Sequence, residues 1–120
     1  MMIYIKNKAE IELMKKAGQI AKGALTKAIE AVRPGIKTIE LNNIALNYIE
    51  QCNAKPSFYL YNGFPRHICV SVNDEVVHGI PDDRVIEEGD IVSIDCGAMF
   101  QGYHGDCADT AFAGQVSPDL

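Results

Sequence analysis

A chain of 120 residues is long enough for one small domain, spanning residues 1–120, and too short for several. Its 48% hydrophobic and 22% charged residues are typical of an ordinary globular protein. The opening MMIYIKNKAEIELMKK lacks the long apolar stretch of a signal peptide or a membrane-spanning helix. The four cysteines form no CxxC pair, which argues against a zinc ribbon or a redox motif and favours an intracellular protein with reduced thiols.

The net charge of -5 is unevenly distributed along the chain. Residues 1–37 carry eight Lys or Arg against three Glu, whereas residues 38–120 carry three basic residues against thirteen acidic ones. A contact of the basic segment with RNA near a ribosome is one interpretation, and a solvated helix face is the more common one. The acidic part would concentrate cations.

Two helices are predicted in the first half of the chain. Asn7, followed three residues later by Glu10, resembles a weak capping box at a helix start, and Pro34-Gly35 ends that helix. Its apolar stripe comprises Ile11, Met14, Gly18, Ala21, Leu25, Ala28 and Val32. Thr38 is a candidate cap for a second helix. The second stripe comprises Leu41, Ile44, Ala45, Tyr48, Ile49 and Cys52, and both stripes are expected to be core.

The amino-acid composition changes after Lys55, where Pro, Gly, Asn and aromatic residues indicate a loop. Strands are then predicted at ICVSV, EVVHGIP and DIVSID and after Cys96, with a tight turn at Asn73-Asp74. The order helix–helix–loop–strands predicts an α+β domain in which a sheet packs against two helices.

Two aspartates are the most informative residues of the predicted sheet. Asp95 ends one apolar run and Asp106 opens a second alternating run, with turn residues between them. A two-residue turn at Gln101-Gly102 would pair residue 95 with residue 108 and make Asp106 the diagonal neighbour of Asp95 on the same face. Carboxylates that close repel each other unless a cation lies between them, and hard oxygen ligands suit divalent metals.

Four segments resemble the N-terminal half of type I methionine aminopeptidases, the bacterial and organellar form: KPSFYLYNGFP, ICVSVNDEVVHGIP, EEGDIVSIDCGA and GYHGDCADTAFAG. The resemblance implies half of a pita-bread fold, an α+β arrangement of two helices packed on an antiparallel sheet. It also implies a cytoplasmic metalloaminopeptidase that removes the initiator methionine from nascent proteins, using water activated by two divalent metal ions. The metal is one of Co, Mn, Fe, Zn or Ni.

The same resemblance assigns roles to individual residues. Asp95 is expected to bind one metal through both oxygens and Asp106 to bridge the two metals. His78 would donate a hydrogen bond to the substrate near the scissile amide. The methionine pocket would be lined by Phe58, Tyr61, Phe64 and Cys69. His104 would share the strand face of Asp106, but the family does not use it as a ligand. The residues expected to be structural are His67, Cys52, Cys96 and Cys107.

The family's catalytic domain is roughly twice this long, and its remaining metal ligands, a histidine and two glutamates, lie in the second half. Two carboxylates alone bind metal weakly. We therefore expect a truncated chain with little activity alone, and with an uncovered apolar face that favours a homodimer or aggregation. Two alternatives stay open: a non-catalytic pita-bread interaction module, and another pita-bread hydrolase resembling Xaa-Pro aminopeptidases. The YNGFP segment favours the methionine-specific branch. No membrane association or direct nucleic-acid role is expected.

Overall fold

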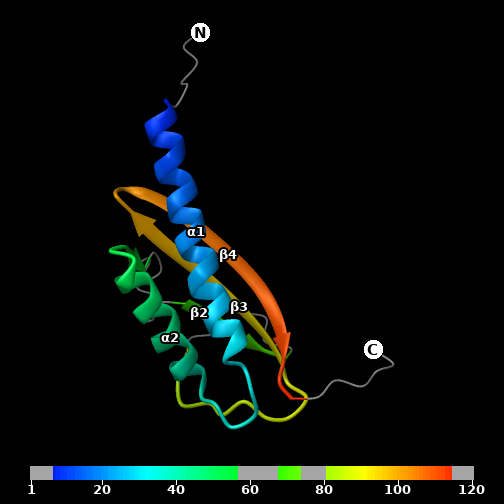
Figure 1. The fold of residues 1–120 in the computed structure, drawn as a ribbon. Coiled ribbons are helices and arrows are strands. Elements are labelled where there is room, and N and C mark those ends of the chain that lie inside the picture. Colours follow the sequence, from blue (N-terminus) through cyan, green and yellow to red (C-terminus); the bar gives the residue numbers. More distant parts are fainter. Residues whose placement is uncertain (1–6, 57–67, 74–80, 115–120) are drawn as a thin grey trace.

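The computed structural model describes residues 7–56, 68–73 and 81–114 (Figure 1). Its elements, in chain order, are α1 (Lys8–Glu30), α2 (Thr38–Gln51), β1 (Lys55–Pro56), β2 (Ile68–Val72), β3 (Ile91–Phe100) and β4 (Tyr103–Phe112). The predicted order of helices followed by strands is confirmed for these residues. The strand predicted at EVVHGIP lies outside the described residues, except for Pro81.

The strands form one antiparallel sheet with β3 at its centre. β4 pairs with β3 along its whole length, so it occupies one edge of that strand. The other edge is shared by β2, which pairs with residues 92–96, and by β1, which pairs with Met99 and Ala98. Both helices lie on the same face of the sheet, α1 against β3 and β4 and α2 against β1 and β2 (Figure 1).

The core lies between the helices and the sheet. Alternate residues of β3 point into it, because successive side chains of a strand face opposite sides. These are Val92, Ile94, Cys96 and Ala98, all buried. The helices contribute Ala17, Ile20, Ala21, Ala24, Leu25 and Ala28 from α1, and Leu41, Ala45 and Ile49 from α2. The many alanines of α1 allow that helix to lie close to the sheet, and each buried Ile or Leu contributes about 1.5–3 kcal/mol.

The start of α1 follows the prediction, but its first turns do not join the core. Asn7 Oδ1 accepts a hydrogen bond from the Glu10 N–H at 2.8 Å, and Glu10 Oε1 accepts one from the Asn7 N–H at 3.3 Å, which completes a capping box. Ile11 and Met14 are 41% and 38% exposed, and burial begins only at Ala17. Their predicted core positions are wrong because the N-terminal part of α1 projects beyond the sheet (Figure 1).

The two helix boundaries between residues 30 and 38 also differ from prediction. α1 ends at Glu30, before Pro34, and Val32 packs against the core from outside the helix. Thr38 does not cap α2, because Lys37 is the N-cap and makes no side-chain capping bond. The Thr38 hydroxyl instead accepts from the Asp82 N–H at 2.8 Å and donates to the Asp82 carbonyl at 3.1 Å. This exchange ties the start of α2 to the segment that leads into β3.

Among the described residues, neither helix combines the length and the apolar character needed to span a bilayer. Asn73 has a φ of 57°, as the predicted turn after β2 requires of its first residue, while the rest of that turn lies outside the described residues.

Candidate metal site

The β3–β4 hairpin has the turn and the register that the sequence predicts. Gln101 and Gly102 have φ values of 50° and 85°, and positive values at both central residues are typical of a type I′ turn. Such a turn matches the twist of the strands that it joins. Asp95 therefore pairs with Ala108, and Gly97 pairs with Asp106.

This register places Asp95 and Asp106 on the sheet face opposite the helices. Residues directly across a strand pair share a face, so Asp106 is the diagonal neighbour of Asp95, as predicted. Diagonal neighbours are about 7–8 Å apart, within reach of longer side chains and of a cation held between them. Asp95 is half-buried, whereas the Asp106 side chain is 70% exposed.

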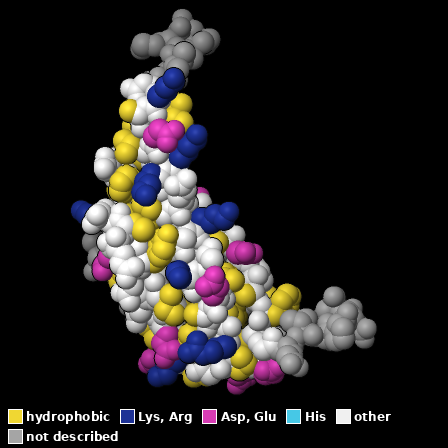
Figure 2. Space-filling view, in the orientation of Figure 1, with side chains coloured by type: hydrophobic (Ala, Val, Ile, Leu, Met, Phe, Trp, Pro, Cys, Tyr) yellow, Lys and Arg dark blue, Asp and Glu magenta, His cyan; other side chains and the backbone are white. Residues whose placement is uncertain are grey.

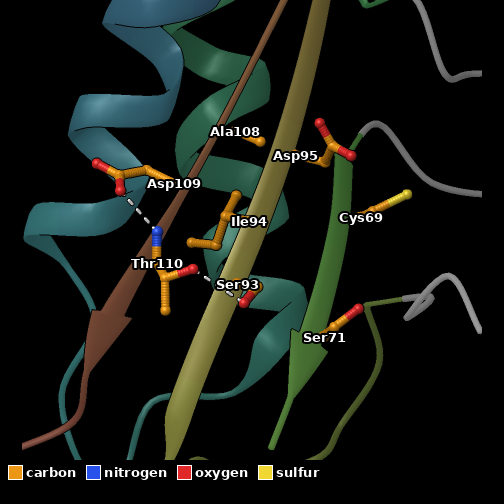
Figure 3. A pocket seen from close by; sticks show the side chains of 8 residues that line it. All are labelled: Cys69, Ser71, Ser93, Ile94, Asp95, Ala108, Asp109 and Thr110. Atoms are coloured by element: carbon orange, nitrogen blue, oxygen red, sulfur yellow. Dashed lines mark hydrogen bonds between the residues drawn. The ribbon is translucent and has the colours of Figure 1, made fainter. Parts of the chain in front are cut away.

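A hollow of about 380 Å³ opens on the same face (Figure 3). It is lined by Cys69 and Ser71 of β2, Ser93, Ile94 and Asp95 of β3, and Ala108, Asp109 and Thr110 of β4. Asp106, which pairs with Gly97, is not among these lining residues. The hollow and the carboxylate pair therefore overlap at Asp95.

The hollow also contains polar groups that sequence reasoning did not single out. Ser93 Oγ and Thr110 Oγ1 lie 3.1 Å apart across the strands, and Asp109 Oδ1 accepts a hydrogen bond from the Thr110 N–H at 2.8 Å (Figure 3). Alternation along the strands could have identified them. Ser93 lies two residues from Asp95 and therefore on the same face. Ser71 and Thr110 pair directly with Ser93, so they share that face.

Cys69 lies directly across from Asp95 in the β2–β3 pairing and is buried. Burial, followed by the nearby Asp95 charge, raises the pKa of the Cys69 thiol to about 11. Burial, with a further contribution from the same aspartate, raises the pKa of Cys96 to about 12. Without a bound cation, both thiols are therefore protonated near neutral pH.

His104 shares the face of Asp106, as predicted from their spacing. Its Nε2 lies 3.9 Å from Asp106 Oδ2, and both side chains are at least half exposed. Residues 7–56, 68–73 and 81–114 contain no cluster of three or more His, Cys, Asp or Glu side chains arranged to hold a metal. The two aspartates thus form a partial ligand set in the described part of the chain. The other predicted site residues, His78, Phe58, Tyr61 and Phe64, lie outside it, as does His67.

The face that carries the aspartates is also apolar. Ile91, Met99 and Phe112 are 42%, 43% and 47% exposed, and their register places all three on this face. No described helix or strand covers them. An uncovered apolar face, as expected from the length of the chain, is therefore present among the described residues.

Comparison with known proteins gives the same assignment as the motifs. A family model for metallopeptidase family M24 matches residues 12–120. The methionine aminopeptidase of Clostridium acetobutylicum is 49% identical over 119 residues, which cover 98% of this chain and 48% of that protein. The chain spans about half the length of the curated relatives that it matches.

Solved structures share the fold. A methionine aminopeptidase from Thermotoga maritima superimposes with a TM-score of 0.90 at 42% identity, covering 98% of this chain and 47% of the other. An X-Pro aminopeptidase from the same organism gives a TM-score of 0.75 at 24% identity and covers 96% of this chain and 31% of the other, a likeness of fold alone. The expected half of a pita-bread fold, with two helices packed on an antiparallel sheet, is confirmed.

Proposed function

Since this chain belongs to metallopeptidase family M24, we propose that it is the N-terminal half of an enzyme that removes the initiator methionine from newly made proteins. The observation that carries the proposal is the hairpin register that sets Asp95 and Asp106 diagonally on one open face. The 49% identity to a methionine aminopeptidase supports this substrate class. The family implies divalent metal ions, and Co, Mn, Fe, Zn and Ni are all compatible with carboxylate ligands.

The donor set fits such ions. Two carboxylates on neighbouring strands supply hard oxygens, the ligands that such divalent ions accept. When bound, the ions would polarise the scissile carbonyl and lower the pKa of a water molecule. Asp95, half-buried between β2 and β4, and the more exposed Asp106 would hold the ions.

Further chain residues would bind the substrate. A hollow of about 380 Å³ is within the range of about 300–1,000 Å³ that is common for small-molecule sites. Cys69 would contribute a neutral, polarisable wall to the methionine pocket, completed by Phe58, Tyr61 and Phe64. His78 would donate a hydrogen bond to the scissile amide and hold it in place.

Complementation tests this assignment. The chain would be mixed with the remaining half of the Clostridium acetobutylicum relative, and hydrolysis of Met-Ala-Ser would be followed with Co(II) or Mn(II). We expect little activity from the 120-residue chain alone, restored activity in the mixture, and its loss in Asp95→Ala and Asp106→Ala. The matched control is Asp83→Ala, which removes an exposed carboxylate outside the hairpin. Full activity of the complemented Asp106→Ala variant would contradict the assignment.

Two other functions have distinct outcomes. A non-catalytic interaction module is favoured by the partial ligand set of the described residues, and it would stay inactive in every mixture. An Xaa-Pro hydrolase shares the fold and would cleave Xaa-Pro peptides in preference to Met-Ala-Ser. A panel containing both peptide classes separates the three.

Partners and location complete the proposal. The apolar open face would associate with a second copy of this chain, which light scattering of the purified chain would detect as a dimer. A well-folded monomer at high concentration would contradict it. Exposed lysines along α1, seen as dark blue side chains in Figure 2, would contact the ribosome, and the triple change of Lys15, Lys16 and Lys22 to Glu should reduce ribosome co-sedimentation. The four cysteines, all within the described part of the chain, form no disulfide bond, which supports a cytoplasmic location.

A further inference from the structure

Strand β4 touches helix α1 backbone to backbone at Gly105. A Cβ atom added to this residue would lie 2.5 Å from the Gly18 nitrogen, 2.6 Å from the Ala17 carbonyl carbon and 2.7 Å from the Ala17 oxygen. All three are backbone atoms in the middle of a helix, so none can rotate away as a flexible side chain would. Only glycine at position 105 permits this separation between strand and helix.

A second contact lies two residues earlier on the same side of the strand. The Tyr103 hydroxyl donates a hydrogen bond to Glu10 Oε2 at 3.1 Å, and the other oxygen of Glu10 completes the capping box of α1. Tyr103 and Gly105 therefore join β4 to the N-terminal half of α1. We call these two interactions the β4–α1 contact: the close approach of Gly105 to Ala17 and Gly18, and the hydrogen bond from Tyr103 to Glu10.

Alternation connects this contact to the candidate metal site. Because Tyr103 and Gly105 face the helix, His104 and Asp106 face the open side. Asp106 receives little support there, since its side chain is 70% exposed and its partner across the strands, Gly97, has no side chain. This part of β4 is held by its pairing with β3 and, from beneath, by α1.

We infer that the β4–α1 contact is a positioning element that sets where Asp106 stands relative to Asp95. Asp95 lies on the central strand β3, which β2 also holds along its other edge, whereas Asp106 lies on β4. A change in the separation between β4 and α1 would therefore move Asp106 more than Asp95. The consequence for metal binding rests on the proposed function, whereas the placement of Asp106 does not.

The chain offers two matched controls on the same helix. A Cβ at Gly23 would also clash, but with the ring of Tyr48 of α2, away from the hairpin. A Cβ at Gly18 would meet no heavy atom within 4 Å, so Gly18→Ala keeps the β4–α1 contact while making the same chemical change. Gly23→Ala thus controls for a steric clash on α1 away from the hairpin, and Gly18→Ala for the added methyl group.

The test compares Gly105→Ala with both controls in the 120-residue chain. Crystal structures without metal would give the distance between the Asp95 and Asp106 Cα atoms, and Mn²⁺ affinity would be measured by water-proton relaxation. In Gly105→Ala we expect this distance to change because Asp106 is displaced. We also expect roughly tenfold weaker Mn²⁺ binding, the size of effect usual for groups that orient metal ligands. Gly23→Ala should show neither change.

An Asp106 that stays in place in the Gly105→Ala structure overturns the inference, as does an equal displacement in Gly23→Ala. If the wild-type chain takes up no Mn²⁺ while Asp106 is displaced in metal-free Gly105→Ala, the positioning role stands and the metal assignment fails. Should Gly105→Ala not fold, Tyr103→Phe removes the second interaction without adding atoms. A smaller displacement of Asp106 would support the inference, and none would contradict it.

Discussion

On the face of the sheet that meets the helices, Val92, Ile94 and Cys96 of β3 are buried, whereas on the opposite face Ile91 and Met99 of the same strand remain exposed. The first face is completed by α1 and α2 within the described residues. The second carries two carboxylates and a hollow. It also carries the exposed side chains of Ile91, Met99 and Phe112, which no described helix or strand covers. Fold and proposed activity therefore depend on opposite faces of one sheet, and only the first is completed by the described helices.

The comparison predicts unequal effects of the same substitution on the two faces. Ile94→Ala removes a buried side chain from β3 and should lower the free energy of unfolding by about 2–5 kcal/mol, through lost burial and a residual cavity. Ile91→Ala, three residues earlier on the open face, should change it by less than about 1 kcal/mol. Urea denaturation of both variants provides the measurement. Equal losses would indicate that the open face is also packed in solution.

A second prediction concerns Asp90, a titrating residue just before β3 begins. Asp90 accepts hydrogen bonds from the Glu87 N–H and the Asn73 side chain, both at 2.9 Å, and these lower the pKa of its carboxyl below 3.8. The stability that this group contributes is present above pH 3.8 and is lost as pH falls through the lower, folded-state pKa. Asp90→Asn should cost about 1–3 kcal/mol at neutral pH and flatten the acid dependence. Urea midpoints measured between pH 2 and 6 test this prediction. An acid slope that is unchanged in Asp90→Asn would contradict it.

The smallest expected effect concerns the turn that joins the two strands. Gly102 has a φ of 85° and no heavy atom within 4 Å of an added Cβ, so Gly102→Ala meets strain in the backbone alone. We expect a loss of about 1–2 kcal/mol in the free energy of unfolding, from placing an alanine in the left-handed region. Gln101→Gly, which relieves that strain at the neighbouring position, should be close to neutral. Thermal unfolding of the pair tests whether the turn limits the stability of the hairpin.

The sequence predicted the hairpin well because two local rules coincide there. A two-residue turn at Gln101-Gly102 fixes the register, and the register fixes which residues share the face of Asp95. The projection of α1 was not predictable in the same way. Periodicity identifies an apolar stripe but does not indicate where the sheet beneath it ends, so Ile11 and Met14 were expected in the core.

Two site features also required tertiary information. The hollow is lined by Asp95 and not by Asp106, which depends on how three strands pack around it and is not specified by the ICVSV pattern. The sequence predicted that Thr38 caps a helix, which is a local interaction. In the structure its hydroxyl instead exchanges hydrogen bonds with the backbone of Asp82, 44 residues away. The roles of the site residues in catalysis came from resemblance to a family, and alternation supplied only their common face.

The hairpin register also bears on how early in folding the site takes shape. Asp95 and Asp106 are eleven positions apart in the sequence, and the strand pair that joins them is closed by a two-residue turn. Hairpins of this kind form in about 1–10 μs, because closing a short loop costs little entropy. The two carboxylates are therefore expected to meet early, before slower long-range packing, and during synthesis a cation could bind them as soon as this hairpin leaves the ribosome.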